Sequence, residues 1–207
     1  MTPYPYEIHI TVDTVPNGNA FKRWCQELNV KPIMLALQSQ SNGMLTDVMT
    51  SSVVIGTLED AHIESRRIES GLRAFGVSTI RRKIETVPWN PMIVETEPGP
   101  SNYFESHIAI SVKKYKNNKL PKATKAHLAN VCRDLGLHLS ANQFKNDETA
   151  VVYMATLREF GTTYEAFKAR TDLVVEDLMH VRYDVLKTVT EYAVWDSNTQ
   201  HDDKWMS

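Results

Sequence analysis

The chain has 207 residues and a formal net charge of −2. Apolar residues make up 42% of it and charged residues 23%, which is ordinary for a globular protein that folds in water. This net charge is too small to attract duplex DNA or an anionic membrane, so we expect neither as a partner.

The first half of the chain is predicted to contain four strands and two helices. Apolar and polar residues alternate over 6–12, which indicates a strand with one apolar face. Apolar residues recur at helical spacing from Phe21 to Leu28 and again from Ala61 to Phe75. The other strands are expected at 33–37, 47–55 and 80–87.

The second half repeats the landmarks of the first half in the same order. The matching segments are Tyr6–Ile10 with Phe104–Ile108, Cys25 with Cys132, and Glu85–Asn90 with Glu191–Asp196. Matched landmarks in a constant order indicate an internal duplication. The order βαββαβ within each half is typical of the split βαβ, ferredoxin-like arrangement.

We therefore predict an α+β protein made by tandem duplication of a ferredoxin-like βαββαβ lobe, with the two lobes facing a central cleft. The expected divisions are an N-terminal lobe at 1–90, a proline-rich linker at 91–102, a C-terminal lobe at 103–196 and a polar tail at 197–207.

Strand alternation assigns a set of polar side chains to the sheet faces that the helices leave open. In the first half these are Glu7, His9, Thr11 and Glu85, and in the second half Glu105, His107, Thr156, Arg158 and Glu191. Two open faces that close on each other would gather both histidines and several carboxylates in one cleft. The alternatives are an ordinary solvated face, or Glu–His hydrogen bonds that only hold the halves together.

Two histidines with hydroxyls and a cation suit acid–base phosphoester chemistry, in which one imidazole accepts a proton and the other donates one. The segment His9-Ile10-Thr11-Val12 resembles the His-hydrophobic-Thr-hydrophobic motif of the two-histidine phosphoesterases. The resemblance implies a bilobal fold that acts on cyclic or 2′,5′-linked nucleotides and RNA ends. The second copy, His107-Ile108-Ala109-Ile110, has alanine where the motif has a hydroxyl.

The leading prediction is a phosphoesterase, possibly a metal-independent phosphodiesterase, that acts on a nucleotide, a cyclic nucleotide or an RNA end. Its predicted catalytic residues are His9, Thr11 and His107. Its predicted substrate-binding residues are Glu7, Glu85, Glu105, Thr156, Arg158 and Glu191. No cofactor and no metal ligands are assigned. A non-catalytic protein that sequesters a nucleotide or small anion, and a His/Glu metal-site protein, stay open as alternatives.

Three features predict a cytoplasmic location. No apolar run reaches the roughly 18 residues that a membrane-spanning helix needs. The first six residues, Met-Thr-Pro-Tyr-Pro-Tyr, do not resemble a signal peptide. Cys25 and Cys132 fall in helical apolar stripes, where free thiols suit a reducing compartment. The expected partner is a small nucleotide or an RNA end, and an oligomer is allowed.

Overall fold

The computed structural model describes residues 3–38, 44–91, 101–114, 122–146 and 150–204. The first half contains β1 (Tyr4–Val12), α1 (Gly18–Glu27), β2 (Lys31–Gln38), β3 (Met44–Gly56), α2 (Leu58–Ala74) and β4 (Thr79–Thr86). The second half contains β5 (Tyr103–Lys113), α4 (Lys122–Asp134), β6 (His138–Asn146), β7 (Ala150–Phe160), α5 (Tyr164–His180) and β8 (Asp184–Asp196), and then a 3₁₀ helix, η1 (Thr199–Lys204).

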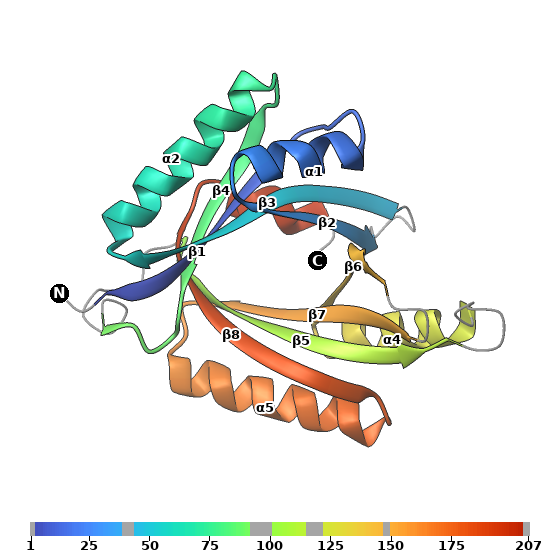
Figure 1. Cartoon of the computed structure of the whole chain (residues 1–207). Helices are drawn as coiled ribbons and strands as arrows, with labels where there is room; N and C mark the ends of the chain where they lie inside the picture. Colours follow the sequence, from blue (N-terminus) through green and yellow to red (C-terminus); the bar gives the residue numbers. More distant parts are fainter. Residues whose placement is uncertain (1–2, 39–43, 92–100, 115–121, 147–149, 205–207) are drawn as a thin grey trace.

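Within the described residues the strands form one closed barrel in the order β1-β3-β2-β6-β7-β5-β8-β4. The two halves join where β2 pairs with β6 and where β4 pairs with β8, both antiparallel. The helices α1 and α2 cover the outside of the barrel on one side, and α4 and α5 cover the opposite side (Figure 1).

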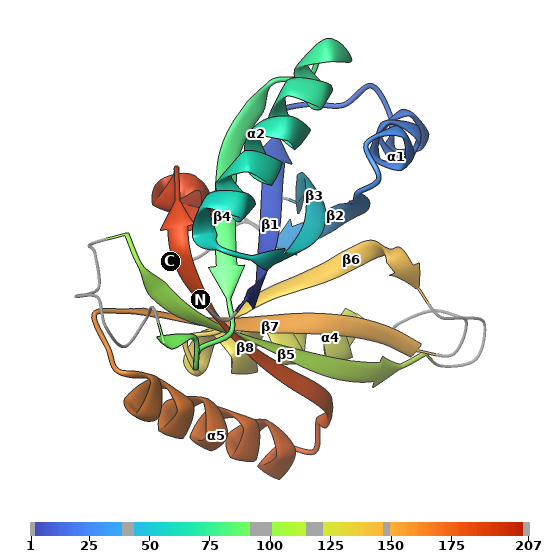
Figure 2. The same ribbon diagram turned by 60° about the vertical axis from the view of Figure 1, so that its left-hand side comes forward.

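The predicted fold class, two ferredoxin-like lobes facing a cleft, is therefore wrong. The sheets of the two halves meet edge to edge and close one barrel, as the turned view in Figure 2 also shows. The physical reason lies in the edge strands, whose unpaired N–H and C=O groups are satisfied when each edge pairs with the other half. Barrel closure removes every open edge and turns the uncovered sheet faces into one interior.

Two apolar clusters lie between the strands and the helices, one in each half. In the first, Ile8 and Ile10 of β1 are fully buried against Phe21 of α1 and Leu72 of α2. The fully buried counterparts in the second are Ile108, Ile110, Leu128, Phe167 and Leu178. Because the apolar face of β1 and β5 points out to the helices, their polar face must point into the barrel.

Local signals in the sequence fix where the helices begin. Asn17 caps α1, with its side-chain oxygen 2.9 Å from the backbone nitrogen of Ala20. Thr57 and Asp60 form a reciprocal capping box at the start of α2. These caps fix where the helices start against the barrel wall.

Two predicted divisions fall partly on parts of the chain that the structure does not describe. Most of the predicted linker at 91–102 lies in 92–100, outside the described residues, and so do the last three residues of the predicted tail at 197–207. The described part of that tail contains η1, whose His201 and Asp202 contact barrel strands. No helix in the described part of the chain is long and apolar enough to span a bilayer.

Candidate functional site

The interior of the barrel carries the same arrangement of glutamate and histidine in each half. On neighbouring strands, Glu7 of β1 lies opposite Glu85 of β4, and Glu105 of β5 lies opposite Glu191 of β8. Like charges directly opposite each other destabilise a strand pair unless a positive group compensates them. Each half therefore places a histidine and a pair of carboxylates where a cation would be stabilising.

In the first half the imidazole of His9 faces both carboxylates. Its Nε2 lies 3.5 Å from Glu7 Oε1 and 3.3 Å from Glu85 Oε2. Its Nδ1 lies 3.2 Å from the carbonyl oxygen of Thr50, which can only accept a hydrogen bond, so Nδ1 carries the proton. Burial lowers the pKa of His9, but the facing carboxylate of Glu85 outweighs burial and the pKa is raised overall.

In the second half the imidazole of His107 repeats this orientation. Its Nε2 lies 3.5 Å from Glu191 Oε2 and 3.8 Å from Glu105 Oε2. Its Nδ1 lies 3.1 Å from the hydroxyl of Thr156. Burial lowers the pKa of His107, which favours a neutral imidazole with one nitrogen available as a ligand.

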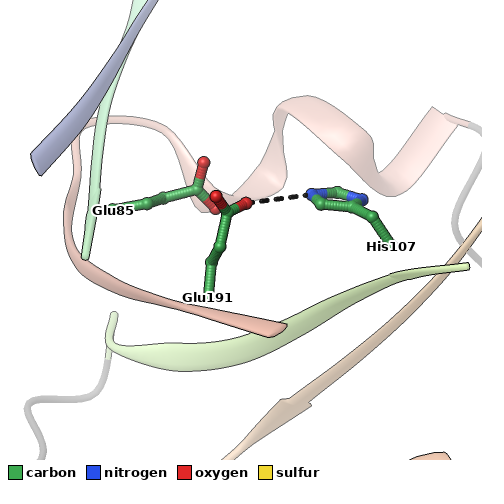
Figure 3. Close-up of side chains that lie close together, drawn as sticks. All are labelled: Glu85, His107 and Glu191. Atoms are coloured by element: carbon green, nitrogen blue, oxygen red, sulfur yellow. Dashed lines mark ion pairs between the residues drawn. The ribbon is translucent and has the colours of Figure 1, made fainter. Parts of the chain in front are cut away.

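The two halves meet at Glu85, His107 and Glu191, which come from β4, β5 and β8. One potential ligand atom from each lies within 4.8 Å of those of the others. Figure 3 shows the two carboxylates close together, with Glu191 directed at the imidazole of His107. Burial and the negative charges of Glu85 and Glu7 raise the pKa of Glu191 to about 8, because two adjacent carboxylates resist ionising together.

Glu85 is the most deeply enclosed member of this group. Its side chain is 1% exposed, and neither carboxylate oxygen accepts a hydrogen bond from the described residues. Lys83 Nζ lies 2.8 Å from Oε1, but this contact lacks hydrogen-bond geometry. Burial opposes ionisation of Glu85, yet the charge of Lys83 outweighs it and the pKa of Glu85 is lowered. Glu85 is thus a buried anion whose lone pairs are unsatisfied.

Glu105, in contrast, is fully occupied by cations. Lys83 Nζ donates to it at 2.8 Å and Arg158 Nε at 2.8 Å. Burial would raise the pKa of Glu105, but Arg158 and Lys83 hold it well below its usual range. Arg158 also contacts Asp202 of η1. The predicted anion-binding arginine is therefore already held by two carboxylates.

Beyond Arg158 the ion pairs continue to the C-terminal segment. Asp202 accepts from Arg81 Nη1 at 3.1 Å, and Arg81 Nη2 donates to Asp196 at 2.6 Å. The Tyr103 hydroxyl also donates to Asp196, at 2.7 Å. These groups connect η1 to β4, β5, β7 and β8, so the C-terminal segment contributes buried charges to the interior.

The structure brings together most of the residues that the sequence analysis singled out. Glu7, His9, Glu85, His107 and Glu191 gather around the two imidazoles, and Thr156 contacts His107. Thr11 is buried further along β1, opposite Met49 and Arg81 in register. Glu105 and Arg158 lie in the ion-pair network.

Sequence reasoning missed two groups that matter to this site. Lys83 alternates with Glu85 on β4, so its position on the same face was visible, but its place between two buried glutamates was not. Asp202 carried no signal in the sequence, because its partners are on β4 and β7, far away along the chain.

Comparison with known proteins gives solved structures alone. No family model and no curated protein matches the chain. A heme-binding protein from Thermus thermophilus is 11% identical, covering 93% of this chain and 92% of its own, with a TM-score of 0.31. A proposed monooxygenase from Fusobacterium nucleatum is 9% identical over 93% and 91%, with a TM-score of 0.30. A variant of the chlorite dismutase from Candidatus Nitrospira defluvii is 11% identical over 94% and 93%, with a TM-score of 0.31. Likeness at this level transfers no ligand or reaction to this chain.

The predicted phosphoesterase function is wrong, and so is its nucleotide-sequestering alternative. The quoted neighbours are a heme-binding protein, a proposed monooxygenase and a chlorite dismutase, with no phosphoesterase among them. The predicted cleft is replaced by a closed barrel, and Arg158 is held by Glu105 and Asp202. An interior rich in carboxylates would also repel a phosphate. The resemblance of His9–Val12 to the two-histidine motif is not tested by these comparisons.

Proposed function

We propose that this chain binds a divalent first-row transition-metal ion inside the barrel, with Glu85, His107 and Glu191 as ligands. The observation that carries the proposal is the buried Glu85 carboxylate, which has no hydrogen bond from the described residues and lies beside the other two groups. A buried anion with unsatisfied lone pairs costs several kcal/mol, roughly, unless a cation or donors compensate it. A bound cation supplies that compensation.

The kind of metal follows from the donor set. One imidazole nitrogen and two carboxylate oxygens are a mixed set that suits Zn²⁺, Fe²⁺ or Mn²⁺ better than the all-oxygen shells that Ca²⁺ and Mg²⁺ prefer. Ligand atoms about 2.1 Å from one ion lie at most about 4.2 Å from each other. Since the three groups spread up to 4.8 Å, they would draw together slightly on binding.

The surroundings of His107 also support a ligand role. Metal-bound histidines usually hold their second ring nitrogen in a hydrogen bond, which fixes the tautomer and the direction of the ring. The Thr156 hydroxyl supplies such a partner for Nδ1 at 3.1 Å. The remaining nitrogen, Nε2, faces Glu191 at 3.5 Å. An ion between them would be bound by a ring that is already oriented.

The test is a calorimetric titration of the full chain, stripped with chelator, against Zn²⁺ and separately against Mn²⁺. Glu85→Gln and His107→Ala should each weaken binding by more than about 100-fold, since loss of outer-shell partners alone costs 10- to 100-fold. The matched control is His127→Ala, which removes an exposed imidazole on α4 and should leave the affinity unchanged. Wild-type protein that binds neither ion above background would overturn the proposal.

We further infer that the protein works in a reducing compartment such as the cytoplasm. Cys25 and Cys132 are both free and buried, one in each apolar cluster. Burial raises the pKa of each thiol to about 12, which keeps both groups protonated and unreactive. Labelling of the native protein with a thiol reagent should therefore be slow at both positions.

A further inference from the structure

We propose that a second divalent ion binds between Glu7, His9 and Glu85, so that the Glu85 carboxylate bridges a two-metal centre. This inference rests on the proposed function, because the first ion sits between Glu85, His107 and Glu191. It assigns His9 and Glu7 a role of their own.

The first argument is the repetition of one geometry in the two halves. His9 Nε2 lies 3.5 and 3.3 Å from the carboxylates of Glu7 and Glu85. His107 Nε2 lies 3.8 and 3.5 Å from the carboxylates of Glu105 and Glu191. In both cases a hydrogen bond of Nδ1 leaves Nε2 on the carboxylate side. If one of these arrangements holds an ion, its counterpart offers the same donor types.

The second argument is the difference between Glu7 and Glu105. Glu105 is bound by Lys83 and by Arg158, so its charge is already compensated. Glu7 receives a hydrogen bond from the Ser51 hydroxyl at 2.7 Å, a neutral donor that leaves its charge in place. The uncompensated carboxylates therefore cluster around His9 and between the two histidines, which is where a second cation would be most stabilised.

The third argument is the position of Glu85 itself. It belongs to the group with His107 and Glu191, and its Oε2 is also 3.3 Å from His9 Nε2. Both of its oxygens lack a hydrogen bond from the described residues. A carboxylate with two available oxygens can bridge two ions, which lie about 3.5–4 Å apart in two-metal centres. Glu85 is thus the one side chain that would contact both ions.

The two ions should differ in how readily they exchange. The side chain of Glu7 is 32% exposed, while those of Glu191 and Glu85 are 19% and 1% exposed. The ion near His9 is therefore nearer to water, and we expect it to bind more weakly and to leave first during dialysis.

The test combines metal counting with electron paramagnetic resonance of the Mn²⁺-loaded full chain. We expect two Mn²⁺ per chain at saturation and the spectrum of a spin-coupled pair. His9→Ala and Glu7→Gln should each reduce the count from two to one and abolish the coupled spectrum. Glu7→Gln keeps the size of a half-exposed side chain, so it guards against loss of folding. The His127→Ala control should keep two ions.

The possible failures separate the two proposals. A single ion in the wild-type protein, unaffected by His9→Ala, would overturn the second ion and leave the first in place. A single ion that His9→Ala weakens at least tenfold would also overturn it, because His9 would then be another ligand of one ion. No bound Mn²⁺ or Zn²⁺ at all would overturn both proposals.

Discussion

His9 and His107 occupy equivalent places on β1 and β5, but their Nδ1 atoms are held by different kinds of group. His9 Nδ1 lies 3.2 Å from the backbone carbonyl of Thr50, and His107 Nδ1 lies 3.1 Å from the side-chain hydroxyl of Thr156. A backbone partner cannot be removed by substitution, whereas a hydroxyl can. The two imidazoles can therefore be perturbed separately.

Thr156→Val should weaken metal binding at His107 by about 10- to 100-fold, because the ring loses the partner that fixes its tautomer and direction. Valine keeps the size and branching of threonine, so the fold should survive. The measurement is the calorimetric affinity for Zn²⁺, with a circular dichroism spectrum to verify folding. An affinity equal to that of the wild type would show that Thr156 does not position the ligand.

Thr50→Val is the matched control and carries a prediction of its own. The Thr50 hydroxyl is buried and has no hydrogen-bond partner among the described residues, while its carbonyl, which contacts His9, stays after the change. Removing an unsatisfied buried hydroxyl should raise the free energy of unfolding by about 1 kcal/mol. Urea denaturation measures this change. A loss of stability would mean that the hydroxyl has a partner in solution.

Asp202→Asn should destabilise the barrel strongly. Asp202 is 2% exposed and contacts both Arg81 and Arg158, so the neutral amide would leave two buried guanidinium groups close together. Removing one partner of a buried ion pair typically costs about 3–5 kcal/mol. The control is Asp172→Asn, which breaks an exposed pair with Lys168 and should change the unfolding free energy by less than about 1 kcal/mol. Equal effects of both changes on urea denaturation would contradict a buried role for η1.

The stability of the fold should fall in acid partly through Asp196. Burial would raise the pKa of this carboxyl, but the hydrogen bonds and charge of Arg81 outweigh burial and lower it. A lowered pKa in the folded state means that the stabilisation is complete above the unfolded pKa, near 3.9, and disappears as the pH falls through the folded value. Asp196→Asn should therefore lose less stability than the wild type between about pH 4 and pH 2. An unchanged pH slope would contradict this assignment.

Strand alternation predicted which side chains share the interior. Because side chains alternate with a period of two along a strand, the polar positions of 6–12 could be assigned to the face away from Ile8 and Ile10. That reasoning brought Glu7, His9 and their counterparts in the second half together correctly.

Barrel closure could not be predicted in the same way. Alternation identifies the faces of a sheet but says nothing about which edges pair, and the joints β2–β6 and β4–β8 connect strands from different halves. The error in fold class follows from that gap. The error in function follows as well, because the closed interior lets buried carboxylates surround the positions at which a phosphate was expected.

The most direct test of the metal proposal is anomalous diffraction from crystals of the full chain soaked in Zn²⁺. The account predicts an anomalous peak about 2.0–2.2 Å from a carboxylate oxygen of Glu85, a carboxylate oxygen of Glu191 and Nε2 of His107. Peaks confined to the outer surface, with the interior between β4, β5 and β8 lacking one, would contradict it.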